Sequence, residues 1–127
     1  MTRTMLQAKL HRVRVTDADL HYEGSCGIDE QLLKASGIRE FQQVEIYNIN
    51  NGERFATYAI KAAEGSGTIS LNGAAARKAM VGDLLIVAAY AALTAEELRS
   101  WRPVIVLVDA RNRPQGSTVP REAMTAS

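Results

Sequence analysis

Short apolar stretches, some alternating with polar residues and some continuous, recur along the chain between glycine-containing turns. Both patterns are typical of strands, the first half-buried and the second fully buried. The predicted strands cover residues 10–16, 44–49, 55–60, 68–71, 84–90 and 103–109. Asn51-Gly52 lies between two of these strands and predicts a hairpin. Many short strands at close spacing favour a β-barrel with small helical insertions.

Three short segments carry helix signals. Asp29 can cap a helix that Gly37 ends, because glycine readily adopts the left-handed conformation found there. The alanine-rich segment 74–80 favours a second short helix, and the Thr-x-x-Glu pattern at 94–97 predicts a capping box. From residue 111 onward the chain is polar and contains two prolines, so we expect a loose tail.

The composition is that of one ordinary globular domain. The chain has 127 residues, of which 46% are apolar and 23% charged, and its net charge is +1. Nothing in these values indicates a nucleic acid or an anionic membrane as a partner. Two histidines and one cysteine do not suffice for a common zinc site, and a single cysteine fits a reducing compartment. The longest apolar run, 84–93, is too short to cross a bilayer and no signal peptide is recognisable, so we expect a cytoplasmic protein.

One dipeptide is a candidate for chemistry. Gly24-Ser25 lies in the segment Tyr-Glu-Gly-Ser-Cys at 22–26. Taken alone, Gly-Ser indicates only a turn. The Gly-x-Ser-x-Gly pattern of a nucleophile elbow is absent from the sequence. The significance of the dipeptide therefore depends on the segments around it.

Several segments in a fixed order carry a resemblance to a known family. The matching segments are 3–7, 9–13, 18–26, 51–52, 57–60, 72–76, 81–83 and 101–103. Each is weak by itself, but their joint order and spacing make a specific signal. Over Met1 to Asp109 the chain resembles the bacterial aspartate α-decarboxylases.

The resemblance implies a mainly β fold, a double-psi β-barrel with short helical insertions, assembled as a homotetramer. Val81-Gly82-Asp83 is similar to the glycine–aspartate box common to such barrels. The whole chain, 1–127, is then one domain, made as an inactive precursor that cleaves itself into 1–24 and 25–127, with the tail from about 111 loose. Whether maturation is spontaneous or needs a helper protein stays open.

The cofactor that the resemblance implies is a covalent pyruvoyl group, formed from Ser25 after the bond to Gly24 breaks. Serine suits this cleavage because it offers a nucleophilic oxygen and a leaving group on Cβ, while glycine tolerates unusual backbone angles. The pyruvoyl ketone forms a Schiff base with L-aspartate and provides the electron sink that ordinary side chains lack. Loss of carbon dioxide then yields β-alanine for pantothenate and coenzyme A biosynthesis.

The resemblance also assigns the remaining site residues. Tyr58 matches the proton donor, and Arg54 matches the residue that holds a substrate carboxylate, for which a guanidinium fork is well suited. The other substrate-binding matches are Thr57, Asn72, Gly73, Ala74, Ala75, Lys9 and His11. Thr57 is further expected to support cleavage by a hydrogen bond near the Gly24 carbonyl. Without the family context these are ordinary strand residues, solvated charges, a turn and a structural histidine.

Strand geometry constrains how these residues meet. Arg54 and Tyr58 are four positions apart, so on a straight strand they share one face with Cα atoms about 13 Å apart. Thr57 is expected on the opposite face unless a bulge intervenes. A site shared between neighbouring subunits, as in the family, would bring the two faces to one substrate. Two departures from the family pattern are Tyr47, where some members carry tryptophan, and Arg77, where histidine is common.

Three other functions fit the sequence less well. A non-catalytic partner-binding module on a related barrel is the main alternative, but it needs no Gly-Ser cleavage point beside a Thr-Tyr pair. A DNA-binding barrel is disfavoured by the near-neutral charge. A decarboxylase that uses pyridoxal phosphate is disfavoured by the short chain, which lacks a recognisable pattern for binding that cofactor.

Overall fold

The computed structural model describes residues 1–21 and 23–118, and strands dominate it. Its strands are β1 (Thr2–Arg14), β2 (Asp17–Asp19), β3 (Ser25–Asp29), β4 (Gln43–Asn48), β5 (Arg54–Ala62), β6 (Ile69–Asn72), β7 (Leu84–Thr94), β8 (Val104–Val108) and β9 (Pro114–Thr118). Its helices are α1 (Glu30–Ser36), the 3-10 helix η1 (Gly73–Lys78) and α2 (Ala95–Leu98). The prediction of a mainly β fold with short helical insertions is confirmed.

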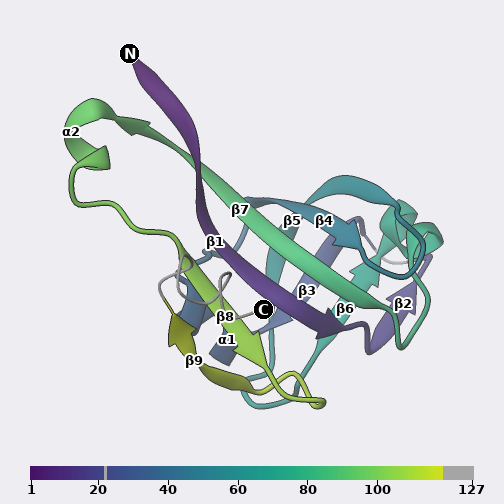
Figure 1. Ribbon diagram of the computed structural model, residues 1–127. Coiled ribbons are helices and arrows are strands. Elements are labelled where there is room, and N and C mark those ends of the chain that lie inside the picture. Colours follow the sequence, from purple (N-terminus) through teal and green to yellow (C-terminus); the bar gives the residue numbers. More distant parts are fainter. Residues whose placement is uncertain (22, 119–127) are drawn as a thin grey trace.

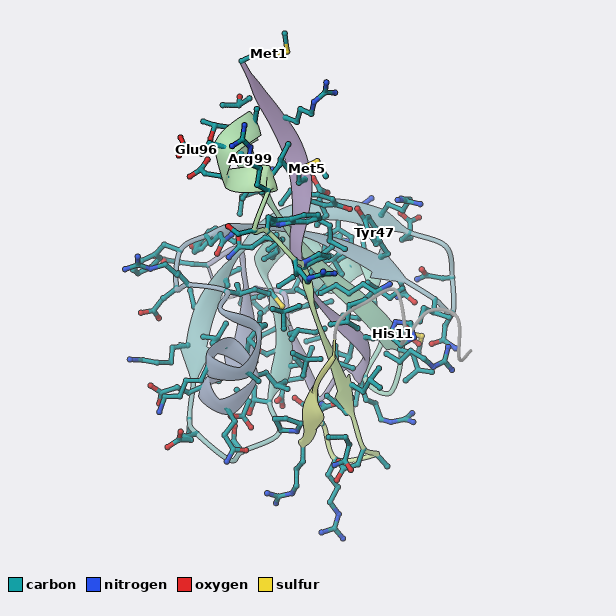
Figure 2. The ribbon with its side chains drawn as sticks, turned by 60° about the vertical axis from the view of Figure 1, so that its left-hand side comes forward. Met1, Met5, His11, Tyr47, Glu96 and Arg99 are labelled. Atoms are coloured by element: carbon teal, nitrogen blue, oxygen red, sulfur yellow. The ribbon has the colours of Figure 1, made fainter. Side chains whose placement is uncertain are left out.

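The described strands form one nine-stranded sheet in the order β2-β6-β3-β5-β4-β7-β1-β8-β9. The sheet curls upon itself (Figure 1), which is compatible with the predicted double-psi β-barrel. β1 lies inside this order, antiparallel to β7 and parallel to β8. The start of β1 and the end of β7 extend from the body as a ribbon that leads to α2, where Met1 and Glu96 lie (Figure 2).

Alternation along β1 separates a core face from an outer face. Leu10 and Val13 are fully buried, whereas Lys9 and His11 lie on the other face and are partly exposed. The pairing of β1 with β7 shifts between His11 and Val13, and Arg12 between them has a φ of 63°. This β-bulge inserts one residue and so returns Val13 to the core.

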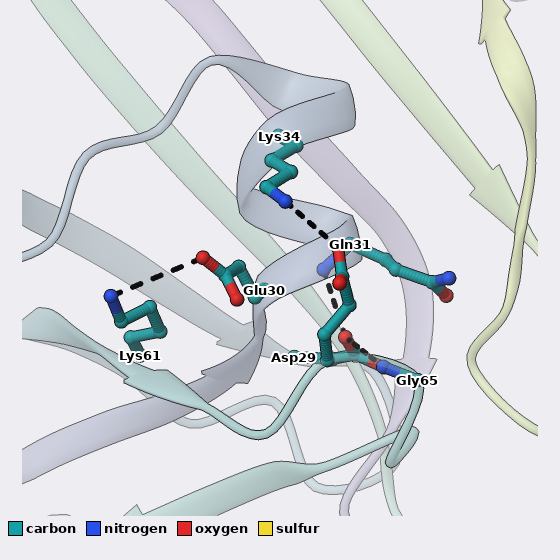
Figure 3. Close-up of polar contacts among 7 residues, drawn as sticks. Asp29, Glu30, Gln31, Lys34, Lys61 and Gly65 are labelled. Carbon is teal, nitrogen blue, oxygen red and sulfur yellow. Dashed lines mark hydrogen bonds and ion pairs between the residues drawn. The ribbon is translucent and has the colours of Figure 1, made fainter.

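The buried carboxylate of Asp29 ties α1 to a neighbouring loop. Its Oδ1 accepts hydrogen bonds from the backbone N–H of Gln31 (2.8 Å) and Gly65 (3.0 Å), and its Oδ2 accepts one from Gly67 (2.8 Å). Figure 3 shows the contacts with Gln31 and Gly65 at the start of α1. Gly37 ends the helix with a φ of 79°. The predicted capping residues of this helix, Asp29 and Gly37, are thereby confirmed.

The prediction of a loose tail from residue 111 is wrong for the part that the structure describes. β9 pairs with β8, and Asn112 is buried. The Asn112 side chain accepts a hydrogen bond from the N–H of Arg14 and donates to the carbonyls of Arg14 and Gly67. These partners are far away in sequence, so the polar composition of the segment gave no sign of them. Residues 119–127 lie outside the described chain.

The remaining elements agree with the sequence patterns to different degrees. The capping box of Thr94 and Glu97 is present as predicted, and the alanine-rich segment is helical but adopts the tighter 3-10 form. The strand expected at 10–16 instead runs from Thr2 to Arg14. Within residues 1–21 and 23–118, no helix has the length and apolar character needed to cross a membrane.

Candidate active site

Ser25 lies where the chain passes from the surface into the core. Gly24 is exposed, and a side chain placed on it would meet no atom within 4 Å. Ser25 is buried, with 1% of its surface exposed. Its Oγ accepts a hydrogen bond from Nδ2 of Asn72 (3.0 Å) and donates one to the carbonyl of Glu23 (3.2 Å). The serine hydroxyl is therefore held by two hydrogen bonds directly after an exposed glycine.

Three adjacent strands bring the central site residues together. In the antiparallel pairing of β3 with β6, Ser25 lies opposite Asn72. In the parallel pairing of β3 with β5, Cys26 lies opposite Ala59, so Ser25 and Tyr58 come immediately before this pair. Because neighbouring residues in register point to the same side of a sheet, the serine, the asparagine and the tyrosine share one face.

The segment after β6 has small residues, so it presents its backbone rather than side chains to the space beside Ser25. Asn72 precedes η1 and makes no side-chain cap to it, and its side-chain amide donates a hydrogen bond to Ser25. Gly73 is buried and has a φ of 66°, a conformation that favours glycine. Ala74 is exposed and Ala75 partly buried. These small residues leave the start of η1 open to a ligand beside the serine.

The predicted arrangement of side chains along β5 is confirmed. β4 and β5 pair without a register shift from Arg54, opposite Tyr47, to Tyr58, opposite Gln43. Arg54 and Tyr58 therefore share the outer face. Thr57 lies opposite the buried Val44 and so faces the core side. Among the described residues, the Thr57 hydroxyl makes no hydrogen bond to Gly24, so its expected support of cleavage stays a prediction.

Arg54 lies against an aromatic pair on the outer face. Its Cζ is 4.1 Å from the centroid of the Tyr47 ring. The hydroxyl oxygen of Tyr47 is 2.8 Å from that of Tyr90 on β7. Both tyrosines line a cavity of about 470 Å³ together with Thr4, Gln43 and Glu45. The aromatic pair and this cavity lie beside the strand that carries the predicted substrate residues.

Lys9 and His11 are not brought to Ser25 within one chain. Both lie on β1, and β5, β4 and β7 stand between β1 and β3 in the sheet. The pKa of His11 is lowered from its ordinary value, first by burial and then by the charges of Lys9 and Arg12. Its Nδ1 is buried without a hydrogen-bond partner in the described chain. His11 also lines a second cavity of about 450 Å³, with two further basic side chains, those of Arg12 and Arg14.

Sequence patterns did not single out three residues near the site. Tyr90 lay in an apolar run and gave no signal of its contact with Tyr47. Phe41 has a φ of 72° and 72% of its surface exposed, and its ring centroid is 6.4 Å from that of Tyr58. Burial raises the pKa of Cys26, next to Ser25, to about 12. The thiol is thus protonated near neutral pH and is not a competing nucleophile.

Comparison with known proteins gives one consistent result. The family profile described as "Aspartate decarboxylase" matches residues 1–115. A protein of Bordetella avium named aspartate 1-decarboxylase is 66% identical over 113 residues, which cover 89% of this chain and 93% of that protein. Proteins of the same name from Methylobacillus flagellatus and Methylococcus capsulatus are 64% and 62% identical, over 89% of this chain and 90% of theirs.

Proposed function

The chain belongs to the aspartate decarboxylase family and is an enzyme that decarboxylates L-aspartate, and we propose that it does so through a pyruvoyl group made from Ser25. The product is β-alanine, which enters pantothenate biosynthesis. The observation that carries the proposal is the hydrogen bond between Asn72 and the buried Ser25 hydroxyl. A non-catalytic binding module, the alternative considered from the sequence, has no support in the comparisons.

The surroundings of Ser25 fit a pyruvoyl group. The residue is buried, and the side-chain amide of Asn72, a hydrogen-bond donor, lies next to its side chain. The start of η1 beside it consists of glycine and alanine, so no large side chain fills the space there. When present, a pyruvoyl ketone there would supply the electron sink for loss of the substrate's α-carboxylate.

The cleavage that would make this group needs only atoms of the chain and water. The Ser25 Oγ attacks the Gly24 carbonyl, the Gly24–Ser25 amide bond breaks, and the hydroxyl proton passes to the freed nitrogen, which leaves an ester. Removal of the Ser25 Cα proton then breaks the Cβ–O bond. This step releases residues 1–24 with a terminal carboxylate and leaves dehydroalanine. Its imine tautomer takes up water and loses ammonia, so no oxidant or reductant is required.

The remaining residues have distinct roles in this proposal. Arg54 binds a substrate carboxylate through its guanidinium edge. The Tyr58 hydroxyl donates a proton to Cα of the substrate after carbon dioxide leaves. Asn72 and the backbone of Gly73, Ala74 and Ala75 orient the substrate, whereas Thr57 supports the cleavage step.

A second copy of the chain completes the proposed site. Lys9 and His11 lie on β1, strands away from Ser25, and on its outer face, which supports a role for them in the site of a neighbouring chain. The proposal therefore includes a homotetramer with shared sites. It also includes one domain over 1–127 and a cytoplasmic location, as expected from the sequence. A maturation factor is an optional partner in it.

Mass spectrometry of the purified protein after incubation tests the proposal. We expect one fragment that ends at Gly24 and one that begins with a pyruvoyl group, while Ser25→Ala stays intact and inactive. Gly65-Ser66 is a second Gly-Ser pair, in an exposed turn, so Ser66→Ala is the matched control and should cleave like the wild type. Decarboxylation of aspartate by a chain that remains whole would overturn the pyruvoyl mechanism.

A further inference from the structure

Arg54 is held over an aromatic ring by the strand register itself. It is the cross-strand neighbour of Tyr47 in the β4–β5 pairing, and its Cζ lies 4.1 Å from the ring centroid. A guanidinium is attracted to the face of an aromatic ring. Stacking occupies the flat face of the guanidinium and leaves its N–H edge free to bind a carboxylate. The contact thus orients the charge without competing for its hydrogen bonds.

The Tyr47 ring is itself held in place by a residue on another strand. Its hydroxyl oxygen lies 2.8 Å from that of Tyr90, and β4 and β7, which carry the two residues, are neighbours in the sheet. This hydrogen bond, followed by burial, raises the pKa of Tyr90 to about 12. Tyr90 therefore keeps its proton near neutral pH, as the hydrogen bond between the two hydroxyls requires.

The aromatic pair also forms a wall of the cavity beside Arg54. Tyr47, Tyr90, Thr4, Gln43 and Glu45 line this space of about 470 Å³, which is large enough for a four-carbon dicarboxylate. Glu45 brings a negative charge to the same wall. An anionic ligand in this region is therefore attracted by Arg54 and repelled by Glu45, which makes its position sensitive to the orientation of the guanidinium.

We propose that Tyr47 and Tyr90 form a positioning pair that fixes the Arg54 guanidinium to receive a carboxylate of the substrate. The inference rests on the proposed role of Arg54 as a carboxylate-binding residue. Both tyrosines are proposed to act through Arg54, so they are positioning residues and not catalytic ones. Tyr90 acts through Tyr47, and Tyr47 acts through Arg54.

Binding of succinate to the processed protein tests this proposal without relying on turnover. Succinate is a dicarboxylate without the amino group of aspartate, and calorimetry gives its dissociation constant. Tyr47→Leu should raise that constant about two- to five-fold, the equivalent of one lost cation–π contact. Tyr47→Trp also loses the hydroxyl bonded to Tyr90 but offers a larger aromatic face, on which cation–π attraction is strongest, and should stay within about two-fold of the wild type. Tyr90→Phe should fall between them, because the ring remains but its anchor is lost.

A spectroscopic measurement checks the geometry directly. The Nε–H proton of Arg54, assigned by its loss in Arg54→Lys, should be shifted upfield by the Tyr47 ring in the wild type and in Tyr47→Trp. The shift should disappear in Tyr47→Leu. An unchanged succinate constant in Tyr47→Leu, or equal weakening in Tyr47→Trp and Tyr47→Leu, would overturn the positioning role.

The two proposals fail in different ways. If the pyruvoyl mechanism is wrong, the wild-type chain stays whole or Ser25→Ala remains active. If only the positioning role is wrong, cleavage proceeds normally and the tyrosine variants bind succinate like the wild type. Melting temperatures of all variants separate a loss of folding from a loss of binding.

Discussion

The side-chain amide of Asn72 donates a hydrogen bond to Ser25 Oγ over 3.0 Å, although 47 positions separate the two residues in sequence. Antiparallel pairing of β3 with β6 places them opposite each other. The contact restricts the serine rotamer at the point where the backbone leaves the surface. This hydrogen bond should favour the proposed cleavage, because a hydroxyl with a fixed direction attacks more often than one that rotates freely.

Replacing Asn72 with alanine should therefore slow maturation. Loss of one hydrogen bond of this kind predicts a cleavage half-time that is longer by roughly two- to ten-fold. Gel or mass analysis of a time course after purification measures it. Asn51→Ala is a matched control, since it also removes a side-chain amide that donates a hydrogen bond, in this case to the carbonyl of Lys78 in an exposed turn. Equal half-times in the two variants would contradict the role of Asn72.

Asp29 should be a major determinant of stability. Asp29→Ala leaves three backbone N–H groups without their acceptor, so the free energy of unfolding should fall by about 3–5 kcal/mol. Asp29→Asn keeps one side-chain oxygen and should cost less. Denaturant titration measures both, with Glu30→Ala as the control. The ion pair of Glu30 with Lys61 spans 3.9 Å near the surface and should contribute under about 1 kcal/mol to the free energy of unfolding.

His11 should make the protein less stable in mild acid. Its pKa in the folded state is lowered from 6.5 by burial and by Lys9 and Arg12, so the folded protein binds this proton less readily than the unfolded chain. Stability therefore falls as the pH drops from 6.5 through the folded-state pKa. His11→Gln should show a smaller decrease in melting temperature between neutral and mildly acidic pH, whereas the exposed-site control His21→Gln should keep the wild-type decrease. The same decrease in His11→Gln and wild type would refute the assignment.

Phe41 should be replaceable with a gain in stability. Its φ of 72° is in the left-handed region, which costs a bulky residue about 1–2 kcal/mol and which asparagine tolerates. The ring contact with Tyr58 is near the outer limit of useful aromatic distances, so the strain outweighs it. Phe41→Asn should raise the free energy of unfolding by about 1 kcal/mol. Phe41→Leu keeps the strain and should not, and equal stability of the two variants would argue against strain.

Local signals in the sequence were enough for some elements and not for others. The caps of α1 and α2 could be predicted because the residues that make them are neighbours in sequence. β3 could not, since it contains a glycine and has few apolar residues, and it exists through pairing with β5 and β6 on both sides. β9 likewise forms because β8 offers it an edge, although its polar sequence resembles a loop.

The same division holds for the candidate site. Family resemblance identified Ser25, Tyr58 and Asn72, but their meeting on one face depends on long-range strand pairing that spacing does not reveal. The shared face of Arg54 and Tyr58 could be predicted because it needs only a straight strand. The contact of Tyr47 with Tyr90 could not, because it joins strands that are 43 positions apart at these residues.

The position of β1 has a consequence for the matured protein. In the proposed cleavage before Ser25, β1 becomes part of the small fragment, yet it is bordered on both sides by strands of the large one. Removing it would split the sheet and expose apolar residues such as Leu10. Denaturation then becomes a dissociation of two polypeptides, so the melting temperature should depend on protein concentration, and refolding after dilution should be far less efficient than for the uncut Ser25→Ala chain. The proposed cleavage would therefore turn a single chain into a complex of two polypeptides that must be kept assembled.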